Sequence, residues 1–308
     1  MENERQRILI TGATGLVGSE LTRQLQAAGT GVNYLTTSSG KLEQKPGYRG
    51  FYWDPGAGEL DPACFDGVRA IVNLAGAPIA QRWTPHAREA IVASRVNSLN
   101  TLRKGLETYG SDRISYLVSA SAIGIYPNSL TEYFTEDNEE QDPGFLGETV
   151  RQWEAAASAI ADLGVPCGLL RIGMVLAAGG GALPAIVKPV RWMAGAPLGS
   201  GRQWQSWIHL EDLAALFRFC VDRELSGVYN AVAPNPVTNA KLTREVASVL
   251  GKPLWLPKVP AWALRLLLGK MATVVLGSQR VCSDKIRDEG FTFSYCNLRP
   301  ALEDLLAG

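Results

Sequence analysis

Residues 7–18, RILITGATGLVG, decide the fold of this chain. A short apolar run, 8–11, is followed by Gly12, Gly15 and Gly18, and then by an amphipathic segment, SELTRQLQAAG. The order is therefore strand, glycine turn and helix. In such a turn the first glycine permits the tight bend, the second lets the backbone approach a pyrophosphate, and the third lets helix and strand pack closely. The N–H groups of the first helical turn then face the anion, so the pattern predicts a dinucleotide site.

Length and composition narrow the class of protein. The chain has 308 residues, of which 46% are hydrophobic, enough for one large domain or a domain with a smaller lobe. Lys and Arg number 30, and so do Asp and Glu, so no charge excess favours nucleic acid, and no polybasic run favours a membrane surface. The five cysteines are scattered without a C-x-x-C pair, so we expect no metal site and no disulfide framework. The charged first residues lack the apolar core of a signal peptide, and we expect a cytoplasmic protein.

Strand and helix patterns alternate through the first half, which is typical of a parallel sheet wrapped by helices. We expect Thr84 to cap the long helix that follows the fourth strand, with Pro85 as its first residue. The predicted strands after the first are 32–37, 50–54, 70–76, 115–126 with its exit loop, and 167–176, and a further helix is predicted at about 145–163.

Beyond Gly179 the chain is rich in Gly, Pro and Trp and has no regular period. We predict an α/β protein with a Rossmann-type, doubly wound parallel sheet and a smaller C-terminal substrate lobe. The dinucleotide-binding domain would span 1–178, with 207–232 returning to it, and the lobe would comprise 179–206 and 233–308. The apolar segment 259–269, VPAWALRLLLG, is too short to span a bilayer. We expect a buried or subunit-facing helix there, which leaves a homodimer open.

Several motifs resemble the extended short-chain dehydrogenase/reductase family, which has the fold of the nucleotide-sugar epimerases. The resemblance covers nearly the whole chain. The broad motifs are TGATGLVG (11–18), NLAG (73–76), VNSLNTL (96–102), SASAIGIY (119–126) and SWIHLEDLA (206–214). A narrower set resembles a branch whose members are usually called epimerase-family proteins and are similar to atypical NADP-binding reductases: WEAAA (153–157), GGGALP (179–184), GSGRQWQSWIH (199–209) and APNPVTN (233–239).

The family's chemistry depends on a tyrosine with a lysine four residues later, and this chain lacks the pair. None of its nine tyrosines has a lysine at that spacing, and the resemblance puts Leu146 and Val150 near the two positions. The resemblance then leaves Ser121 as the main catalytic candidate, with a serine at the end of a buried strand as the alternative. Tyr126 lies close by in the sequence and is a second candidate for supplying a proton.

The substrate is less defined than the fold. Nucleotide-sugar enzymes of the family usually carry an arginine before the late histidine, where it clamps the diphosphate, and the resemblance puts Gln205 near that position. A glutamine cannot form the charged bidentate pair that arginine forms. Arg202 is an alternative cation. We therefore expect a small-molecule substrate of unknown identity.

The residues after the second strand indicate which dinucleotide binds. An acid there would accept from both ribose hydroxyls and select NAD, whereas this chain has hydroxyl side chains and then Lys41, which suit a 2′-phosphate. We predict NADP(H), against the alternative of an ordinary polar loop. The resemblance implies that Arg95 points toward the cofactor; the alternative is that Arg95 is an ordinary solvated residue of its helix. The predicted cofactor-binding residues are Gly12, Thr14, Gly15, Leu16, Val17, Gly18, Thr36, Thr37, Ser38, Asp54, Leu74, Ala75, Gly76, Arg95 and Val175.

Other conspicuous residues have ordinary alternatives. Trp192, Trp204 and Trp207 either wall a substrate pocket or form lobe core, and the resemblance makes His209 structural. The acidic stretch 132–144 is expected to be a solvated loop. Two functions remain: an NADP(H)-binding oxidoreductase or epimerase-like enzyme of atypical mechanism, or a catalytically inactive NADPH-binding sensor or partner-binding protein that kept the fold.

Overall fold

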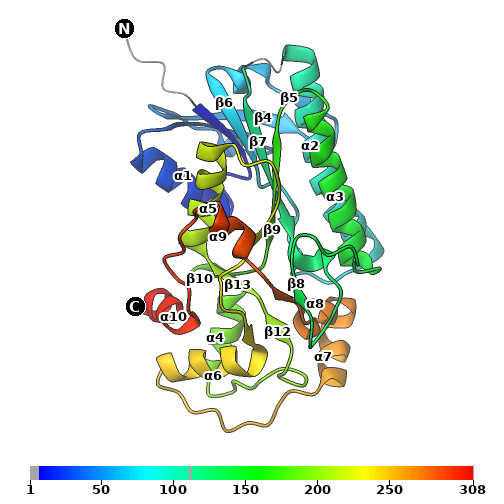
Figure 1. Ribbon diagram of the computed structural model, residues 1–308, viewed down its shortest axis with the longest axis vertical. Helices are drawn as coiled ribbons and strands as arrows, with labels where there is room; N and C mark the ends of the chain where they lie inside the picture. Colours follow the sequence, from blue (N-terminus) through cyan, green and yellow to red (C-terminus); the bar gives the residue numbers. More distant parts are fainter. Residues whose placement is uncertain (1–6, 111–112, 308) are drawn as a thin grey trace.

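The computed structural model describes residues 7–110 and 113–307, and its centre is a large sheet (Figure 1). The strand order is β14-β9-β7-β6-β1-β2-β4-β3, with β5 paired to β4. The strands from β14 to β4 run parallel, and β3 and β5 are antiparallel additions at one edge. Their bounds are β1 Arg7–Thr11, β2 Gly31–Thr36, β3 Gln44–Lys45, β4 Tyr48–Asp54, β5 Glu59–Leu60, β6 Val68–Asn73, β7 Tyr116–Ala122, β9 Cys167–Ile172 and β14 Gly227–Ala231.

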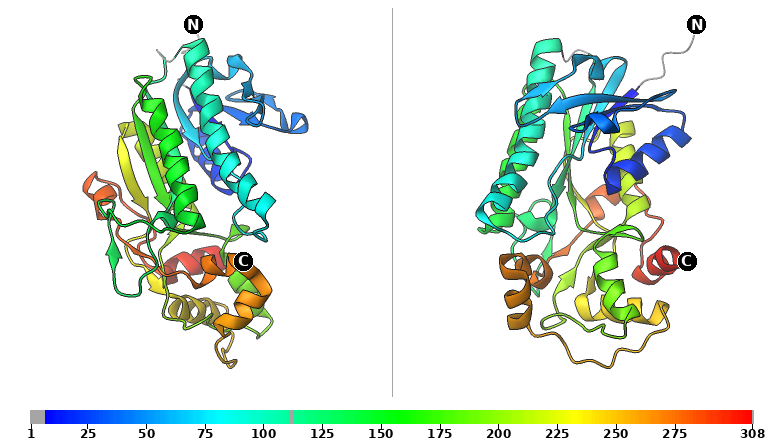
Figure 2. Two further views of the ribbon diagram at one scale, coloured as in Figure 1. Left: turned by 90° about the vertical axis from the view of Figure 1, so that its right-hand side faces the viewer. Right: turned by 180° about the vertical axis from the view of Figure 1, so that it is seen from behind.

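Helices cover both faces of this sheet, which confirms the doubly wound α/β prediction (Figure 2). α1 (Leu16–Ala27) and α5 (Leu210–Arg223) pack on one face, and α2 (Pro85–Tyr109) and α3 (Phe145–Ala161) pack on the other. Because both faces are covered, the central strands are buried along nearly their whole length rather than alternating between buried and exposed residues.

The chain reverses its direction of travel across the sheet at β1. It runs from β1 outward to β2 and β4, and then returns to the other side of β1 with β6, β7, β9 and β14. In open parallel sheets, ligands bind at the carboxyl ends of the strands beside such a reversal. The glycine turn lies at this point, between β1 and α1.

Sequence-derived boundaries agree closely for the helices. Thr84 caps α2, its Oγ1 accepting from the Ala87 N–H at 3.2 Å, with Pro85 as the first helical residue. The predicted strands 32–37, 50–54 and 70–76 are β2, β4 and β6 with ends shifted by a few residues. Short 3₁₀ turns follow several strands: η1 Ser39–Lys41, η2 Pro62–Phe65 and η3 Ile123–Ile125.

The prediction of one strand over 167–176 is wrong, because the chain changes sheets at Gly173. β9 ends at Ile172, and β10 (Met174–Ala177) leaves the central sheet to pair with β13 (Trp207–His209) and β11 (Gly180–Gly181). A Cβ at Gly173 would lie 2.4 Å from the Ser206 carbonyl oxygen. Only glycine therefore lets these two segments approach so closely, and the crossing leads the chain from the sheet into the lower part of the molecule.

The lower part of Figure 1 is built from two stretches that are separate in the sequence. Its core holds Leu183, Trp207, Leu242 and Leu302. Its elements are α4 (Leu183–Arg191), β12 (Trp204–Gln205), β15 (Val237–Thr238), α6 (Asn239–Val249), α7 (Ala261–Leu268), η4 (Gly269–Met271), α8 (Ala272–Leu276), β16 (Arg280–Val281) and α10 (Leu298–Leu306). α9 (Asp284–Asp288) instead packs against β14 of the central sheet, where Ile286 joins the main core. β16 pairs with β8 (Tyr133–Phe134), which ties the C-terminal segment to the loop before α3.

The expectation of a buried helix at 259–269 is wrong for most of its side chains. Within α7 only Leu264 is buried, whereas Leu266 is 83% exposed and Leu267 is 81% exposed. The alternative, a helix facing a second subunit, stays a prediction. In the part of the chain that the structure describes, no helix is long and apolar enough to cross a membrane.

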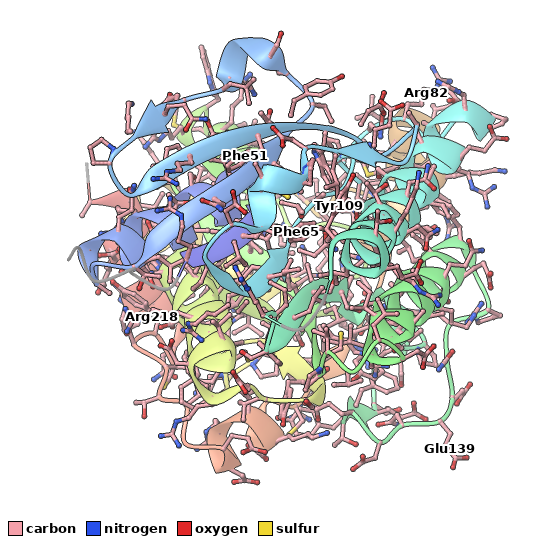
Figure 3. The ribbon with its side chains drawn as sticks, turned by 90° about the horizontal axis from the view of Figure 1, so that it is seen from above. Phe51, Phe65, Arg82, Tyr109, Glu139 and Arg218 are labelled. Carbon is pink, nitrogen blue, oxygen red and sulfur yellow. The ribbon has the colours of Figure 1, made fainter. Side chains whose placement is uncertain are left out.

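The acidic stretch 132–144 is only partly solvated. Figure 3 shows Glu139 pointing away from the body of the molecule. Glu136, in contrast, turns inward, where its Oε1 accepts from the Asn230 N–H at 2.7 Å and burial raises the pKa of its carboxyl. Asp142 holds the start of α3 by accepting from the backbone N–H groups of Gly144 and Gly147.

Candidate functional site

The glycine turn forms an open backbone cradle. Gly12 has a φ of 70°, and the Gly15 N–H donates to the Gly12 carbonyl at 2.9 Å. A Cβ on Gly18 would lie 2.2 Å from the same oxygen, so a side chain there would break the turn. α1 begins after Gly15 without a side-chain cap, which leaves the N–H groups of its first turn, from Leu16 and Val17 onward, for an external acceptor.

A buried hydrogen-bond network joins this turn to the loop after β6. The Thr11 hydroxyl donates to Asn73 Oδ1 at 2.8 Å and accepts from the N–H groups of Leu74 and Ala75. Asn73 in turn donates to the Ser119 hydroxyl at 3.0 Å. The network fixes the ends of β1, β6 and β7 relative to one another, so the loop 74–76 and the glycine turn face each other across the crevice.

The end of β2 carries hydroxyl groups and no acid. Thr36 is buried, and its Oγ1 accepts from the Ser38 N–H at 3.2 Å, while Thr37 and Ser38 themselves are exposed, as is Lys41. Asp54 lies at the end of β4, two strands from the glycine turn, and its carboxylate accepts from the N–H groups at 56 and 57. The carboxylate of Asp54 therefore holds the β4–β5 turn.

Thr14 and Gly15 are exposed at the turn, and β11 passes over the start of α1. A Cβ on Gly180 would lie 3.0 Å from Leu16 Cδ1, and one on Gly181 would lie 2.5 Å from the Val175 carbonyl oxygen. Leu16 and Val175 are therefore brought to the same end of the crevice by the glycines of β11.

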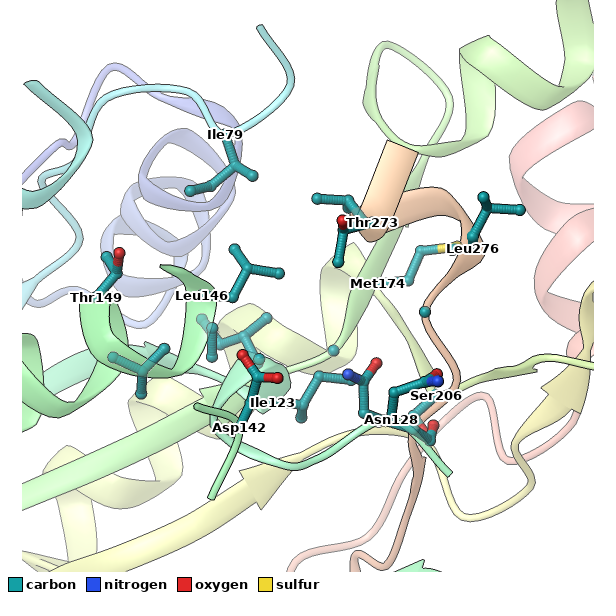
Figure 4. Close-up of a pocket in the computed structure, with 18 of the residues that line it drawn as sticks. Ile79, Ile123, Asn128, Asp142, Leu146, Thr149, Met174, Ser206, Thr273 and Leu276 are labelled. Carbon is teal, nitrogen blue, oxygen red and sulfur yellow. The ribbon is translucent and has the colours of Figure 1, made fainter. Parts of the chain in front are cut away.

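A cavity of about 860 Å³ lies between the carboxyl ends of β7 and β9 and the segment α7–α8 (Figure 4). Cavities of this size hold small organic ligands. In Figure 4, Ile79 and Leu146 lie on one side of the space and Met174, Thr273 and Leu276 on the other.

The walls of the cavity are largely apolar, with a few polar groups. Amide side chains come from Asn128, Gln205 and Gln279. Asn128 Oδ1 accepts from the Ser278 N–H at 2.7 Å, whereas the side-chain amide of Gln205 makes no hydrogen bond with residues 7–110 and 113–307. The charged residues in the lining are Arg95, Arg265, Lys270 and Asp142.

Arg95 is the buried cation of this cavity. Its Nη1 donates to the carbonyls of Ala77 and Ile91 at 3.1 and 2.9 Å, and its guanidinium lies 4.9 Å from the centre of the Trp153 ring. In the described part of the chain no carboxylate lies within ion-pair distance of it. Burial lowers its pKa to about 10, so it remains charged at neutral pH. A Cβ on Gly76 would lie 3.2 Å from its Cζ, so Arg95 contacts both the loop 74–76 and the cavity.

Ser121 and Tyr126 are brought together, but in the interior rather than at the cavity wall. The Ser121 hydroxyl donates to Glu154 Oε1 at 2.5 Å, and Glu154 forms a bidentate ion pair with Arg171 at 2.9 Å for each contact. The Tyr126 hydroxyl accepts from Arg171 Nη1 at 3.1 Å and donates to Asn230 Oδ1 at 2.7 Å.

This network follows from the alternation of side chains along β7. Ser121 turns toward α3, and the next residue, Ala122, lines the cavity. Burial raises the pKa of Tyr126, and the opposing effect of Arg171 does not cancel that rise. Burial alone would lower the pKa of Arg171, but the hydrogen bonds and charge of Glu154 outweigh it and raise the net value.

The positions at which the resemblance expects Tyr and Lys do face the cavity. Leu146 and Val150, one helical turn apart on α3, both line it, together with Trp153. Gln205, which the resemblance places near the diphosphate clamp, lines it as well, whereas Arg202 is exposed. The positions to which the resemblance assigns the reactive pair and the clamp therefore carry two apolar side chains and one neutral amide at the cavity wall.

The three tryptophans do not form one cluster. Trp207 is fully buried in the lobe core, Trp204 lines the cavity beneath the guanidinium of Arg280 at 4.6 Å, and Trp192 is 77% exposed. His209 is buried, as a structural residue would be: its Nδ1 accepts from the Glu211 N–H at 3.1 Å and its ring stacks on Tyr295. Among the described residues, no group of His, Cys, Asp and Glu side chains is arranged to hold a metal ion.

Sequence reasoning missed two parts of this site. One is the Glu154–Arg171 pair, for which the signal was an arginine within an otherwise apolar strand, LLRIG. The other is that α7 and α8 form a wall of the cavity: the sequence assigned 233–308 to the substrate lobe, but no motif in this segment indicates which of its residues face the ligand.

The comparisons with known proteins agree with this layout. The NAD dependent epimerase/dehydratase family matches residues 8–231, and a domain of unknown function (DUF1731) matches 259–305. Curated relatives include the epimerase family protein SDR39U1 homolog, chloroplastic, of Arabidopsis thaliana, 37% identical over 99% of this chain and 88% of its own. The epimerase family protein YfhF of Bacillus subtilis is 36% identical over 97% of this chain and 98% of its own.

Among solved structures, the human epimerase family protein SDR39U1 with NADPH is similar with a TM-score of 0.86 and 31% identity, covering 98% of this chain and 99% of that one. A nucleoside-diphosphate sugar epimerase from Corynebacterium glutamicum has a TM-score of 0.78 and 32% identity, covering 98% of this chain and 58% of that one. With this agreement in sequence and fold over nearly its full length, the chain belongs to the NAD dependent epimerase/dehydratase family.

Proposed function

We propose that this protein binds NADP(H) in the crevice at the glycine turn and acts as an oxidoreductase on a small molecule held in the adjoining cavity. The cradle at Gly12, Gly15 and Gly18 fits a pyrophosphate, since it has a tight turn, no obstructing Cβ and an uncapped helix N-terminus. The similar human protein is described with NADPH. When bound, NADPH would supply a hydride to the substrate.

The assignment of NADP(H) over NAD rests on the end of β2. Thr37, Ser38 and Lys41 are exposed there, and an acid that would repel a 2′-phosphate is missing from that stretch. The groups assigned to the cofactor are Gly12, Thr14, Gly15, Leu16, Val17, Gly18, Thr36, Thr37, Ser38, Asp54, Leu74, Ala75, Gly76, Arg95 and Val175. In this set Asp54 acts through the turn that its carboxylate holds.

The observation that carries the proposal is the position of Arg95. It is a buried, charged guanidinium without an acidic partner among the described residues, and it contacts both the loop 74–76 and the cavity. In the family a lysine would hold the cofactor ribose, and Val150 stands near that position here. Arg95 therefore replaces that lysine as the cation between cofactor and substrate.

Ser121 and Tyr126 lie in the interior next to the cavity, where they stabilise its wall without lining it. Their hydroxyls are held by Glu154, Arg171 and Asn230, so we assign them to positioning the end of β7 rather than to proton transfer. Leu146 and Val150 keep the reacting end of the cavity dry. The five cysteines are free thiols, which suits a reducing, cytoplasmic setting.

The proposal is tested by calorimetric titration with NADPH and with NADH. Wild-type protein should bind NADPH more tightly, and Lys41→Ala should weaken NADPH binding more than NADH binding, because only NADPH carries the 2′-phosphate. Arg95→Met should weaken binding of both, and Arg103→Met, at a half-buried position on the same helix, is the matched control. Equal binding of both dinucleotides by the wild type would reject the NADP(H) assignment.

A second function, an NADPH-binding sensor without turnover, is favoured by one observation: neither candidate hydroxyl reaches the cavity wall. NADPH carrying deuterium at the nicotinamide C4 separates the two functions. Deuterium appearing in a carbonyl substrate from a broad panel would establish the enzyme. NADPH binding without transfer to any member would favour the sensor.

A further inference from the structure

Two segments of the lower part of the molecule contain no acidic residue. Residues 179–206 and 246–283 together carry eight Lys and Arg side chains and no Asp or Glu, in a chain whose formal net charge is zero. Seven of the eight are exposed, and none of the eight forms an ion pair within the described chain. The exposed ones are Lys188, Arg191, Arg202, Lys252, Lys258, Arg265 and Lys270.

The two segments lie side by side. Leu198 and Val259 form a β-bridge, the Gly199 N–H donates to the Val259 carbonyl at 2.8 Å, and Lys258 Nζ donates to the Ser200 carbonyl at 2.8 Å. They lie in the part of the molecule below the central sheet in Figure 1, where α4 and α7 are labelled. We call the exposed residues of these two segments the acid-free surface.

The acid-free surface also carries the most exposed apolar side chains of the described structure. Leu266 is 83% exposed, Leu267 81%, Trp192 77%, and Trp255 and Trp262 69% each. Elsewhere in the described chain the most exposed large hydrophobic residue is Tyr109, at 55%. Protruding Trp and Leu side chains among unpaired Lys and Arg are the composition of a helix that lies in a lipid interface.

We propose that the acid-free surface docks on an anionic lipid bilayer, with Trp262, Leu266 and Leu267 of α7 inserted among the acyl chains and the surrounding cations on the headgroups. Each Lys or Arg near such a surface adds to the attraction, and the apolar side chains add the energy of leaving water. This surface could not be predicted from the sequence, because its cations are spread over two segments and form no polybasic run.

Charge favours a bilayer over a second copy of the chain. A twofold interface would place the acid-free surface against itself, so unpaired cations would face cations with no acid to compensate them. Shape points the same way, because the most exposed apolar side chains stand out from a short helix and a loop, and an adaptable apolar medium receives them without a matching groove.

Docking there would also place the cavity beside the membrane. Arg265, Lys270, Thr273 and Val274 belong to the segment that carries the inserted side chains, and all four line the cavity. An apolar ligand dissolved in the bilayer would therefore meet the wall formed by α7 and α8 first. The docking proposal does not depend on the proposed reaction, since it concerns the surface alone.

The test is flotation of the full-length protein with vesicles of phosphatidylcholine alone and of phosphatidylcholine mixed with phosphatidylglycerol. The protein is expected to float with the anionic vesicles only, and increasingly weakly as salt is raised. Leu266→Ser/Leu267→Ser should bind at least about tenfold more weakly, because both side chains leave the interface. Its control is Tyr109→Ser at the far end of the molecule, near the top of the sheet (Figure 3).

A charge variant separates the two contributions. Lys188→Glu/Lys252→Glu should weaken binding to anionic vesicles, whereas Arg113→Glu, at an exposed position shortly before β7 and outside the acid-free surface, should not. Failure of the wild type to float with anionic vesicles at low salt would overturn the proposal. So would binding that the leucine variant leaves unchanged, or sedimentation showing a dimer that the leucine variant dissociates, since the face would then belong to a second copy.

Discussion

Removing the charge of Glu154 should destabilise the protein far more than removing the charge of an ordinary glutamate on the same helix. The Glu154 and Arg171 side chains are 14% and 8% exposed, and the pair is bidentate. Glu154→Gln leaves the Arg171 guanidinium buried without a compensating carboxylate. Breaking a buried pair in this way costs about 3–5 kcal/mol, and we expect about 3 because glutamine still accepts one hydrogen bond.

The matched control is Glu148→Gln. Glu148 also lies on α3 and pairs with Arg151, at 2.7 Å, but on the surface, so its loss should change stability little. Thermal and urea unfolding of both variants measure the difference. A loss of about 3 kcal/mol should lower the melting temperature of Glu154→Gln by on the order of 5 °C.

A double variant tests the cause. Glu154→Gln/Arg171→Met removes the stranded charge as well, so part of the lost stability should return. Equal melting temperatures for Glu154→Gln and Glu148→Gln would refute the reasoning. A double variant whose loss of stability equals the sum of the losses of Glu154→Gln and Arg171→Met would also refute it, because the two residues would then act independently.

Three further outcomes are expected. Gly18→Ala should weaken NADPH binding at least about tenfold, because the added Cβ would lie 2.2 Å from the Gly12 carbonyl oxygen. Gly179→Ala should leave binding unchanged, because no atom lies within 4 Å of its added Cβ; calorimetric titration with NADPH measures both variants. Leu146→Trp should fill the cavity and abolish turnover or substrate binding while NADPH binding persists; retained substrate binding would place the substrate elsewhere. A thiol reagent at neutral pH should modify Cys296 first, because its side chain is exposed, whereas burial raises the pKa of the thiols of Cys167 and Cys220 to about 12 each. Cys296→Ser should remove the fast phase of modification; a second fast-reacting thiol would contradict this.

The sheet could be predicted because each central strand is a short apolar run bounded by turn residues. The glycine turn, the cap at Thr84 and the exposed end of β2 are likewise local features of the sequence. Gly173 shows where local prediction fails. The sequence around it looks like one continuous strand, but the chain changes sheets there because it must pass close to the Ser206 carbonyl, which is distant along the chain.

The candidate site was predicted less completely for a similar reason. That Ser121 turns inward depends on which face of β7 meets α3, and the partner that holds it, Glu154, lies a whole helix away. The exposure of α7 contradicted the expectation from its apolar composition. Hydrophobicity alone does not distinguish a helix that packs inside from one whose apolar partner is not part of the chain.

The pairing of β8 with β16 also affects when the protein becomes functional during its synthesis. β8 emerges from the ribosome long before its partner β16. Gln205 and Ser206 likewise cannot make their contacts with Gln279 until that residue has been synthesised. The central sheet can be complete, from β1 to β14, while α7 and α8, the far wall of the cavity, are still being translated. A nascent chain would therefore hold its cofactor crevice before it has any place for a second ligand, and its last quarter decides when that place appears.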